Sequence, residues 1–589
     1  MIDFRLYRVA WLPALAAFVV MMFSLEGEPE PIEPQIAPTA FDGDRAEINN
    51  RQILNAADER RPGGEGDAAV AEQVRSRFEE VTAGSVAIQQ FTESVDGEDA
   101  DLTNVILTLP GETDSTVLVI AARDSASGPG AASSAAATAT LVELADVLAA
   151  TEHTKTIVLV STDAGGEGSA GAREFIEGYP DRDLVEAAIV VGQPGAAEPS
   201  KPHVLHDSTD DRSTNAQLVS IAEQAVADQA DRAPGGRGTF ADLARLAMPS
   251  AAGDQSVLIA EGVDTIAFSS AGERPLPPER DAPDDFDPEV MTEFGSAALA
   301  TVLVLDQATT SLDHGPDAYV GFSGSLIPGW SIAVMALALI LPAGLAAVDG
   351  VARAARRRFG LIRSLAWAVG LALPPLATVV AIYVLAVMGL IVRPLYPFDP
   401  GRFGLGLGEL VILLLLAATL VGGYLFTGLG HPPRRARGEA LVPALGAAAV
   451  AGALVSWLLN PYLALLLVPA AHVWLVAARR RPPSRALTLG LAALALLPAA
   501  LALKVSAGAV GAGPWDLVLM IADGHIGTLA VIALCPLVGA LVGLVILAWS
   551  EIRAGASAPR SGVPRTKPRL SEADSGVVDA DAGHARATP

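Results

Sequence analysis

Long runs of apolar residues constrain this chain more than any other feature. A backbone inside a bilayer must satisfy its own hydrogen bonds, so a run of about 20 apolar residues predicts a membrane-spanning helix. The first run covers residues 9–25 and follows Arg5 and Arg8. The later runs lie near residues 326–348, 365–391, 409–429, 440–459, 462–478, 486–507 and 526–549. Together they predict a multi-pass membrane protein with about eight transmembrane helices.

The first run is short enough to be a cleaved signal peptide. No small-x-small cleavage site precedes Glu26, and more apolar runs follow, so an uncleaved anchor over residues 1–25 is expected. Arginines gather in alternate loops between the later runs. They are Arg353, Arg356, Arg357, Arg358, Arg363, Arg434, Arg435, Arg437, Arg479, Arg480, Arg481 and Arg485. The positive-inside rule therefore predicts cytoplasmic N- and C-termini and an extracytoplasmic segment at residues 26–325.

The long segment between the first two runs carries most of the chain's 66 acidic residues. Such an acidic domain argues against a nucleic-acid partner, because nucleic acids select basic surfaces. The single cysteine, Cys535, lies in an apolar run, so this segment can form no disulfide. A domain of this size can bury enough core without one. Polar groups within the apolar runs are sparse, and no charge pair typical of an ion-coupled transporter is evident.

Composition and periodicity divide the remaining chain. Residues 26–66 are rich in Pro, Gly and acids and predict a linker, and residues 554–589 predict a disordered cytoplasmic tail. Between them, residues 326–549 form the predicted seven-helix bundle. In residues 67–310, strands are expected at 105–109, 117–121, 156–161, 187–191 and 264–269, and helices at 69–81, 135–150, 169–178, 213–229 and 288–308. This alternation predicts an α/β domain with a mixed, mostly parallel sheet and helices on both faces.

Ligands of such sheets bind beyond the carboxyl ends of the strands. Two segments there read VLVIAARDSASGPGAASSAAATATLVELADVL and TIVLVSTDAGGEGSAGAREF. They resemble the M28-type di-zinc aminopeptidases over about residues 67–310, with the turn at 128–131, Asp163, Gly168, Gly171 and Phe175 in register. The resemblance implies the peptidase fold and a site built for two zinc ions.

The zinc ligands and the general base of that family do not follow the framework. Their positions fall on Ala122, Ser133, Gly165, Gly166, Gly192 and Gln255. Methyl, hydroxyl, hydrogen and amide groups cannot replace imidazole or carboxylate ligands. Asp124 and Asp254 remain, and in the family these orient metal-binding groups. The resemblance therefore predicts no catalytic residue, no metal ligand and no cofactor; zinc enters only if other residues rebuild the site.

Other residues offer little to rebuild that site. Glu167 stands one place beyond the missing glutamate pair, but the flanking glycines fix the register, so its side chain is expected at the loop surface. His203 and His206 lie in an extended segment, where residues three apart face opposite sides. His153 and His314 are expected in solvated loops. Serines 127, 133 and 134 suit a turn and a helix cap better than a nucleophile.

The predicted ligand groove therefore consists of polar groups beyond the strand ends. Its candidate residues are Asp124, Ser133, Asp163, Glu167, Asp254 and Gln255. The first hypothesis is a pseudoenzyme, a membrane protein whose aminopeptidase-like domain binds or scaffolds without catalysis. One alternative is an active membrane metallopeptidase with a rearranged zinc site. A third is a transporter or lipid-handling bundle capped by the outer domain.

The arrangement of anchor, outer peptidase-like domain and helical bundle is similar to that of the GPI-transamidase peptidase-like subunit and of endoplasmic-reticulum membrane metallopeptidases. This similarity is architectural, and a fold by itself does not fix function. The Ala-, Arg- and Gly-rich composition suggests a bacterium and its plasma membrane. The expected partners are membrane lipids and an unidentified protein, with no nucleic acid.

Overall fold

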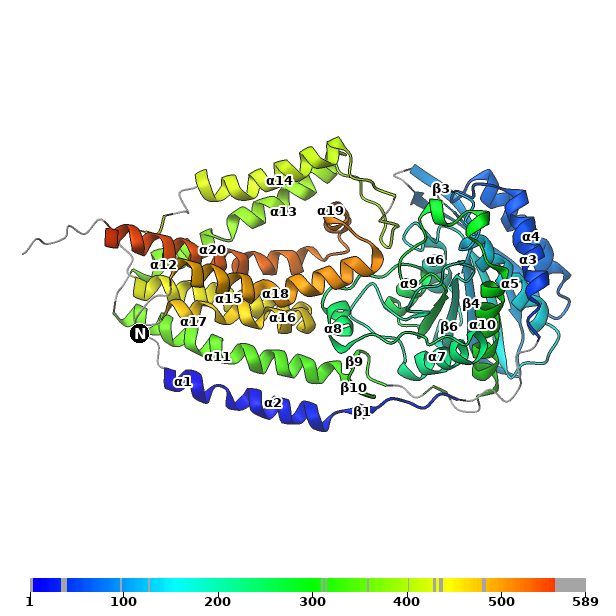
Figure 1. Ribbon diagram of the computed structural model, residues 1–589, viewed down its shortest axis with the longest axis horizontal. Coiled ribbons are helices and arrows are strands. Elements are labelled where there is room, and N and C mark those ends of the chain that lie inside the picture. The colour runs from blue at the N-terminus through cyan, green and yellow to red at the C-terminus, as the bar shows by residue number, and fades with distance from the viewer. Residues whose placement is uncertain are drawn as a thin grey trace, which may run out of the picture.

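The computed structural model places an α/β domain beside a bundle of long helices (Figure 1). It describes residues 4–32, 40–95, 98–125, 128–308, 311–312, 315–357, 360–400, 402–426, 431–433, 438–478 and 484–556. The arginine clusters predicted near 434–437 and 479–481, His314, and the tail beyond residue 556 lie outside these residues.

A seven-stranded sheet organises the α/β domain, in the order β2-β3-β5-β4-β6-β8-β7. Its strands are β2 (Ser85–Val95), β3 (Glu98–Leu109), β4 (Thr113–Ala122), β5 (Lys155–Thr162), β6 (Val185–Gln193), β7 (Val204–Leu205) and β8 (Thr265–Ser269). The central strands β5, β4, β6 and β8 are parallel, whereas β2, β3 and β7 pair antiparallel. The predicted mixed sheet is confirmed.

Alternating side chains on the buried strands create two hydrophobic layers. On β4, Val117 and Val119 point into one layer, and Leu118 and Ile120 point into the other. The first layer is covered by α3 (Gly43–Ala56), α4 (Glu65–Glu80), α5 (Ser134–Leu148), α7 (Ala216–Ala230) and α10 (Pro288–Gln307). The second is covered by α6 (Ala170–Gly178) and α9 (Asp254–Ala260). Helices on both faces leave the strand ends as the accessible edge.

Elements that the sequence did not predict include α3, α9, β2 and β7. Helix α3 lies inside the predicted linker of residues 26–66 and buries Ala46 and Ile53 in the main core. Its amino end is capped by Asp42, whose carboxylate accepts a hydrogen bond from the Arg45 amide. Strand β2 was missed because its side chains are mostly exposed or half-buried, so it lacks the apolar alternation of a core strand.

The bundle begins with two helices of the predicted anchor and continues after the sheet domain. Its members are α1 (Phe4–Val9), α2 (Leu12–Phe23), α11 (Gly329–Arg356), α12 (Leu361–Gly370), α13 (Leu373–Val387), α14 (Leu407–Phe426), α15 (Gly438–Leu459), α16 (Pro461–His472), α17 (Trp474–Ala477), α18 (Arg485–Val510), α19 (Pro514–Asp523) and α20 (Thr528–Ala556). The break between α12 and α13 falls just before Pro374-Pro375, where two missing amide donors interrupt the helix.

Seven of the described helices are long and apolar enough to cross a membrane. One of them, α10, instead packs against α7 and α3 in the core of the sheet domain. The other six, with the shorter apolar helices at Tyr7–Phe23 and Pro461–Ala477, correspond to the predicted spans. The chain therefore combines a mixed α/β domain with apolar helices suited to a membrane.

The two parts meet at α8 (Thr239–Ala247), which packs against α16 and α18 (Figure 1). Side chains from the bundle hydrogen-bond to the backbone of this region: the Asn460 amide donates to the Leu246 carbonyl at 2.8 Å, and the Ser506 hydroxyl donates to the Ala244 carbonyl at 3.0 Å. A small sheet of β1 (Glu26–Gly27), β9 (Tyr319–Gly321) and β10 (Ser325–Pro328) pairs the segment that follows α2 with the segment that precedes α11. These contacts fix the domain over one end of the bundle.

Candidate functional site

A cavity of about 220 Å³ lies beyond the carboxyl ends of the parallel strands, where the sequence predicted a groove. Eight sequence-predicted positions line it: Ala122, Asp124, Ser133, Gly165, Gly166, Gly192, Asp254 and Gln255. Asp163 and Glu167 are not among the described residues that line it. The topology thus gathers positions from β4, the loop after β5, the end of β6, and the starts of α5 and α9.

Asp124 follows β4 and binds the backbone of the loop after β5. Its carboxylate accepts hydrogen bonds from the amides of Gly165, at 2.6 Å, and Gly166, at 3.4 Å. Burial, followed by repulsion from Asp163 and Asp254, raises the pKa of Asp124 to about 6. Asp124 therefore ties two neighbouring strand ends together.

The loop after β5 packs directly onto the end of β4. A Cβ atom built on Gly165 would approach the Cβ of Ala122 more closely than two carbon atoms can, and would lie 3.2 Å from Asp124 Oδ1. A Cβ on Gly166 would meet Asp124 Oδ2 at 3.8 Å, an ordinary contact. Position 165 therefore admits glycine alone without rearrangement, whereas position 166 has room.

The Asp163 carboxylate binds other groups of the domain and does not face the groove. Its carboxylate accepts from the amides of Thr103, at 3.1 Å, and Ala164, at 2.8 Å. It also forms an ion pair with buried Arg123 at 3.0 Å. Arg123 in turn pairs with Asp67 of α4 at 2.6 Å, and burial of this three-residue cluster raises the pKa of Asp67. The cluster locks α4 and two strand ends together behind the groove.

Asp254 and Gln255 open α9 at the opposite wall. Asp254 Oδ2 accepts from the Thr162 hydroxyl at 3.0 Å, and its Oδ1 is buried. Burial raises the pKa of this carboxyl, whereas hydrogen bonds from the Ser169 and Thr162 hydroxyls lower it. Gln255 donates to the Ala252 carbonyl of its own turn at 2.6 Å. Asp254 therefore brings a buried carboxyl to the wall of the groove.

The amino end of α5 forms the floor. Ser133 donates its hydroxyl to Asp281, whose carboxylate also accepts from the amides of Ala132, at 2.8 Å, and Ser133, at 3.1 Å. Asp281 thus supplies the helix cap that the sequence assigned to serines. Ser134 accepts from buried Arg60 at 2.8 Å, and Ser127 lies outside the described residues. No signal in the sequence marked Asp281 or Arg60, which come from distant segments.

Glu167 is buried, 2% exposed, rather than at the loop surface as predicted. It is covered by the described residues of the loop between α13 and α14, 388–400 and 402–406, hereafter the α13–α14 loop. Arg402 of this loop forms an ion pair with Glu167, and Phe398 forms a backbone bridge to it. The Gly168 amide donates to the Pro397 carbonyl at 2.8 Å. The correction follows from a tertiary contact between segments more than 200 residues apart.

The same loop reaches the groove itself. Pro397, Phe398, Asp399 and Arg402 all line the cavity. Tyr396 accepts a hydrogen bond from the Ala251 amide at 2.8 Å and stacks on His525 with ring centroids 3.6 Å apart. One wall of the groove therefore belongs to the helical bundle.

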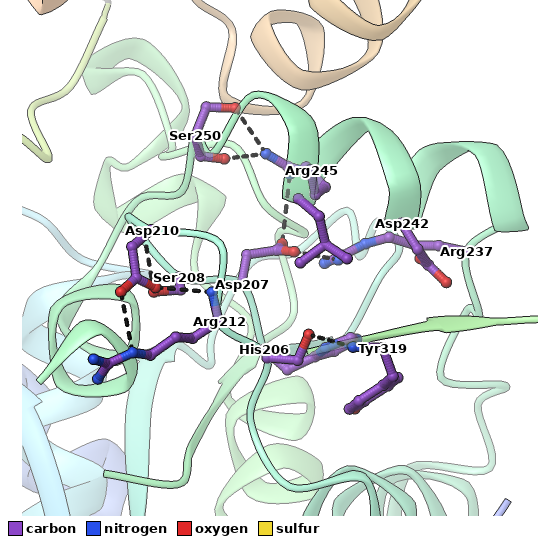
Figure 2. A pocket seen from close by; sticks show the side chains of 12 residues that line it. His206, Asp207, Ser208, Asp210, Arg212, Arg237, Asp242, Arg245, Ser250 and Tyr319 are labelled. Carbon is purple, nitrogen blue, oxygen red and sulfur yellow. Dashed lines mark hydrogen bonds and ion pairs between the residues drawn. The ribbon is translucent and has the colours of Figure 1, made fainter. Parts of the chain in front are cut away.

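A buried ion network surrounds the Arg245 side chain of α8, and Figure 2 shows its members Asp207, Arg237 and Arg245. Arg237 pairs with Asp207 at 2.5 Å and with Glu273 at 2.8 Å, and Arg245 of α8 also contacts both acids. Glu273 lines the groove as well. Arg245 further donates to the Ser250 hydroxyl at 3.1 Å, so the network fastens the segment between α8 and α9.

The histidines have separate structural positions. His153 is buried and contacts Asp306 at 3.0 Å, so the prediction that it lies in a solvated loop was wrong. Burial lowers the pKa of His153, but the hydrogen bonds to Asp306 and to the Leu148 carbonyl outweigh this effect and raise it. His203 contacts the Ser269 carbonyl, whereas burial lowers the pKa of His206 to about 4. Within the described residues, no group of three or more His, Cys, Asp or Glu is placed to hold a metal ion.

Solved structures similar to the chain include a glutaminyl cyclase from an Acidobacteriales bacterium, with 18% identity, a TM-score of 0.39, and 47% of this chain and 99% of the other covered. Another is BSAP, a zinc aminopeptidase from Bacillus subtilis, with 13% identity, a TM-score of 0.37, and coverage of 44% and 94%. No curated protein matches the chain. Residues 104–302 match the model of Peptidase family M28, and this part of the chain is an M28 family domain.

Proposed function

We propose that this protein is a membrane-embedded binding protein, a pseudoenzyme whose M28 domain recognises a ligand without zinc catalysis. The packing of Gly165 against Ala122 carries the proposal. Histidine and glutamate side chains at these two positions would need the space that the loop backbone and Ala122 share. The loop is instead held closed by the bonds from Gly165 and Gly166 to Asp124.

The donor chemistry agrees with that reading. Zinc sites in proteins use imidazole, thiolate and carboxylate ligands. Ala122, Gly165, Gly166 and Gly192 supply none of these, and the Ser133 hydroxyl is bound to Asp281. The residues at these positions therefore do not fit a pair of zinc ions, and no reaction step is assigned to a metal.

The groove favours a ligand that carries an amine. Five carboxylates line it, those of Asp124, Asp254, Glu273, Asp281 and Asp399, together with one arginine, Arg402, which pairs with Glu167. Burial is the largest influence on the pKa of Asp254 and raises it, although hydrogen bonds from the Ser169 and Thr162 hydroxyls lower it. A protonated amine placed beside Asp254 would donate to this carboxyl and offset the charge of neighbouring carboxylates. We assign the ligand as a peptide or small molecule with a free primary amine.

Membrane placement forms part of the proposal. The α13–α14 loop, Asn460 and the end of α18 all contact the M28 domain, so these connections share one side of a membrane with it. They are the arginine-poor connections of the sequence, which the positive-inside rule puts outside. We propose a bacterial plasma-membrane protein with cytoplasmic termini, residues 26–325 outside, and membrane lipids and an unidentified protein as partners.

The test measures binding by the full chain in lipid nanodiscs. Calorimetry compares trialanine with N-acetyl-trialanine, which has the same backbone but no ionisable amine. Free trialanine should bind, and Asp254→Asn should weaken it about 10- to 100-fold, because a hydrogen bond to a buried charge is lost. The matched control is Asp99→Asn, an exposed carboxylate on β3, which should bind as wild type.

Three results would contradict the proposal. Equal binding of the acetylated peptide would exclude amine recognition. Full affinity in Asp254→Asn would exclude the assigned carboxylate. Release of alanine from trialanine after addition of zinc, followed by chromatography, would favour a working metallopeptidase.

A further inference from the structure

A cavity of about 820 Å³ lies at the junction of the two parts. Its floor and sides come from the carboxyl end of α18, from α19, and from the first turns of α20, with Asn460 and Leu463 beside them. Its roof is the segment 247–250 after α8 together with residues 209–211. The cavity therefore lies between the ends of apolar helices and the underside of the M28 domain, where Figure 1 places α8 against α16 and α18.

The lining is apolar and continues onto the outer surface of the helices. Leu503 and Leu529 line the cavity and are 37% and 66% exposed. Both belong to helices long and apolar enough to cross a membrane, so hydrocarbon is the medium at their exposed faces. Close-packed proteins leave few voids, and ligand pockets typically measure about 300–1,000 Å³. The occupant that can enter sideways from this surface is an acyl chain.

The roof gives the cavity one charged end. Asp210 pairs with Arg212 at 3.4 Å and accepts from the Ser208 hydroxyl at 2.7 Å. Beside it, Asp211 is half-buried, and burial followed by repulsion from Asp210 raises its pKa. His525 contacts the Pro249 carbonyl at 3.1 Å, and burial lowers its pKa to about 4, so it is neutral. The polar end is therefore acidic and complements a cationic group.

We propose that this cavity binds a phospholipid of the leaflet that faces the M28 domain. One acyl chain lies between α18 and α20, and an amine-bearing headgroup reaches Asp211. The site is separate from the amine-binding groove, although neighbouring residues line both. Residues 247–250 form the roof of the lipid cavity, and residues 252–255 form a wall of the groove. Hydrogen bonds from Ser250 to the Ser506 carbonyl, at 3.1 Å, and from Ser506 to the Ala244 carbonyl hold this roof on α18.

The experiment uses the full chain in nanodiscs that contain a trace of phosphatidylethanolamine with a diazirine on its acyl chain. After photolysis, labelled peptides are mapped by mass spectrometry. Peptides covering residues 517–534 should carry label that excess unlabelled phosphatidylethanolamine removes. Ala507→Trp places a bulky indole ring in the cavity where the acyl chain would lie, and it should reduce this label about tenfold. Ala417→Trp, on the exposed face of α14, is the matched control and should leave it unchanged.

Phosphatidylglycerol with the same diazirine chain tests the headgroup. It should label the site about threefold less than phosphatidylethanolamine, as expected for one partly solvated ion pair, and Asp211→Asn should remove the difference. Equal labelling by both lipids in wild type would overturn the headgroup assignment. Label that competitor lipid does not remove, or that persists in Ala507→Trp, would overturn the site.

Folding is checked independently. If Ala507→Trp elutes as an aggregate, Met520→Phe, which enlarges another cavity-lining side chain, replaces it with the same expectation. Trialanine binding is measured on each folded variant. A variant that loses lipid labelling but still binds trialanine supports a separate lipid site. A variant that loses trialanine binding but keeps lipid labelling has changed the groove alone, which contradicts the expectation for a cavity substitution.

Discussion

Replacing Gly165 by alanine tests the closed packing at the heart of the candidate site. The new methyl group would overlap the Cβ of Ala122 and crowd Asp124. Overpacking a tight site costs about 1–3 kcal/mol. Alanine also restricts the unfolded chain, which offsets about 0.4–1 kcal/mol of that cost. Gly165→Ala should therefore destabilise the M28 domain by about 1–2 kcal/mol.

The assay is the thermal midpoint of the full chain in detergent, recorded at one heating rate because unfolding of such proteins is commonly kinetically controlled. For a domain of this size the cost corresponds to a decrease of about 2–8 °C. Gly166→Ala is the matched control, since its methyl group meets only Asp124 Oδ2 at 3.8 Å. Its midpoint should stay close to that of wild type.

A double-mutant cycle isolates the responsible contact. Ala122→Gly removes the atom that the new methyl group strikes, so Gly165→Ala should cost much less in that background. The coupling energy between the two positions should be about 1–2 kcal/mol, within the range found for residues in contact. Equal midpoints for Gly165→Ala and Gly166→Ala, or strict additivity in the cycle, would refute the argument from packing.

Three further predictions concern the buried Asp124 carboxyl, the missing zinc ligands and the membrane arrangement. The pKa of Asp124 is raised to about 6, so its contribution to stability is fully present below its unfolded pKa of about 4 and is lost as the pH rises through 6. The difference in unfolding free energy between wild type and Asp124→Asn should therefore change by about 3 kcal/mol across that window. An unchanged difference would contradict the raised pKa. Chelator should leave the thermal midpoint of the full chain unchanged, and a decrease of several degrees that zinc restores would reinstate a metal site. Reporter fusions should distinguish the two sides of the membrane, and one exchanged pair would mean that a helix was miscounted. The cytoplasmic fusions follow Arg358, Arg437 and Arg481, and the outside fusions lie near Asp399 and Gly513.

The sequence predicted the positions of some groove residues but not the roles of all of them. We could place Ala122, Gly165 and Gly166 at strand ends because an apolar run followed by a glycine-rich turn marks the end of a buried strand. The roles of Asp124 and Asp163 could not be separated in the same way. Both follow a strand, but one carboxylate lies beside the cavity while the other turns back to Arg123 and Thr103.

Local sequence patterns could not predict groove residues that come from distant segments of the chain. Arg60 and Asp281 lie in stretches without periodicity, yet they complete the floor of the groove and the cap of α5. Strand β2 and helix α3 were missed for a related reason. Their sequences are polar enough to suit a linker, and the sheet edge and the core that receive them supply the missing stabilisation.

The amino-acid sequence by itself determined the apolar spans, the α/β alternation and the absence of zinc-ligand side chains at the family positions. The spans and the alternation depend on local composition, which solvent and bilayer select directly, whereas the positions of the zinc ligands follow from the resemblance to the M28 family. Only the tertiary structure decided that the α13–α14 loop forms a groove wall, that Glu167 is buried against Arg402, and that an apolar cavity opens beneath the M28 domain. These features arise where surfaces far apart in the chain meet, and the free energy of such contacts belongs to the pair of surfaces rather than to either segment.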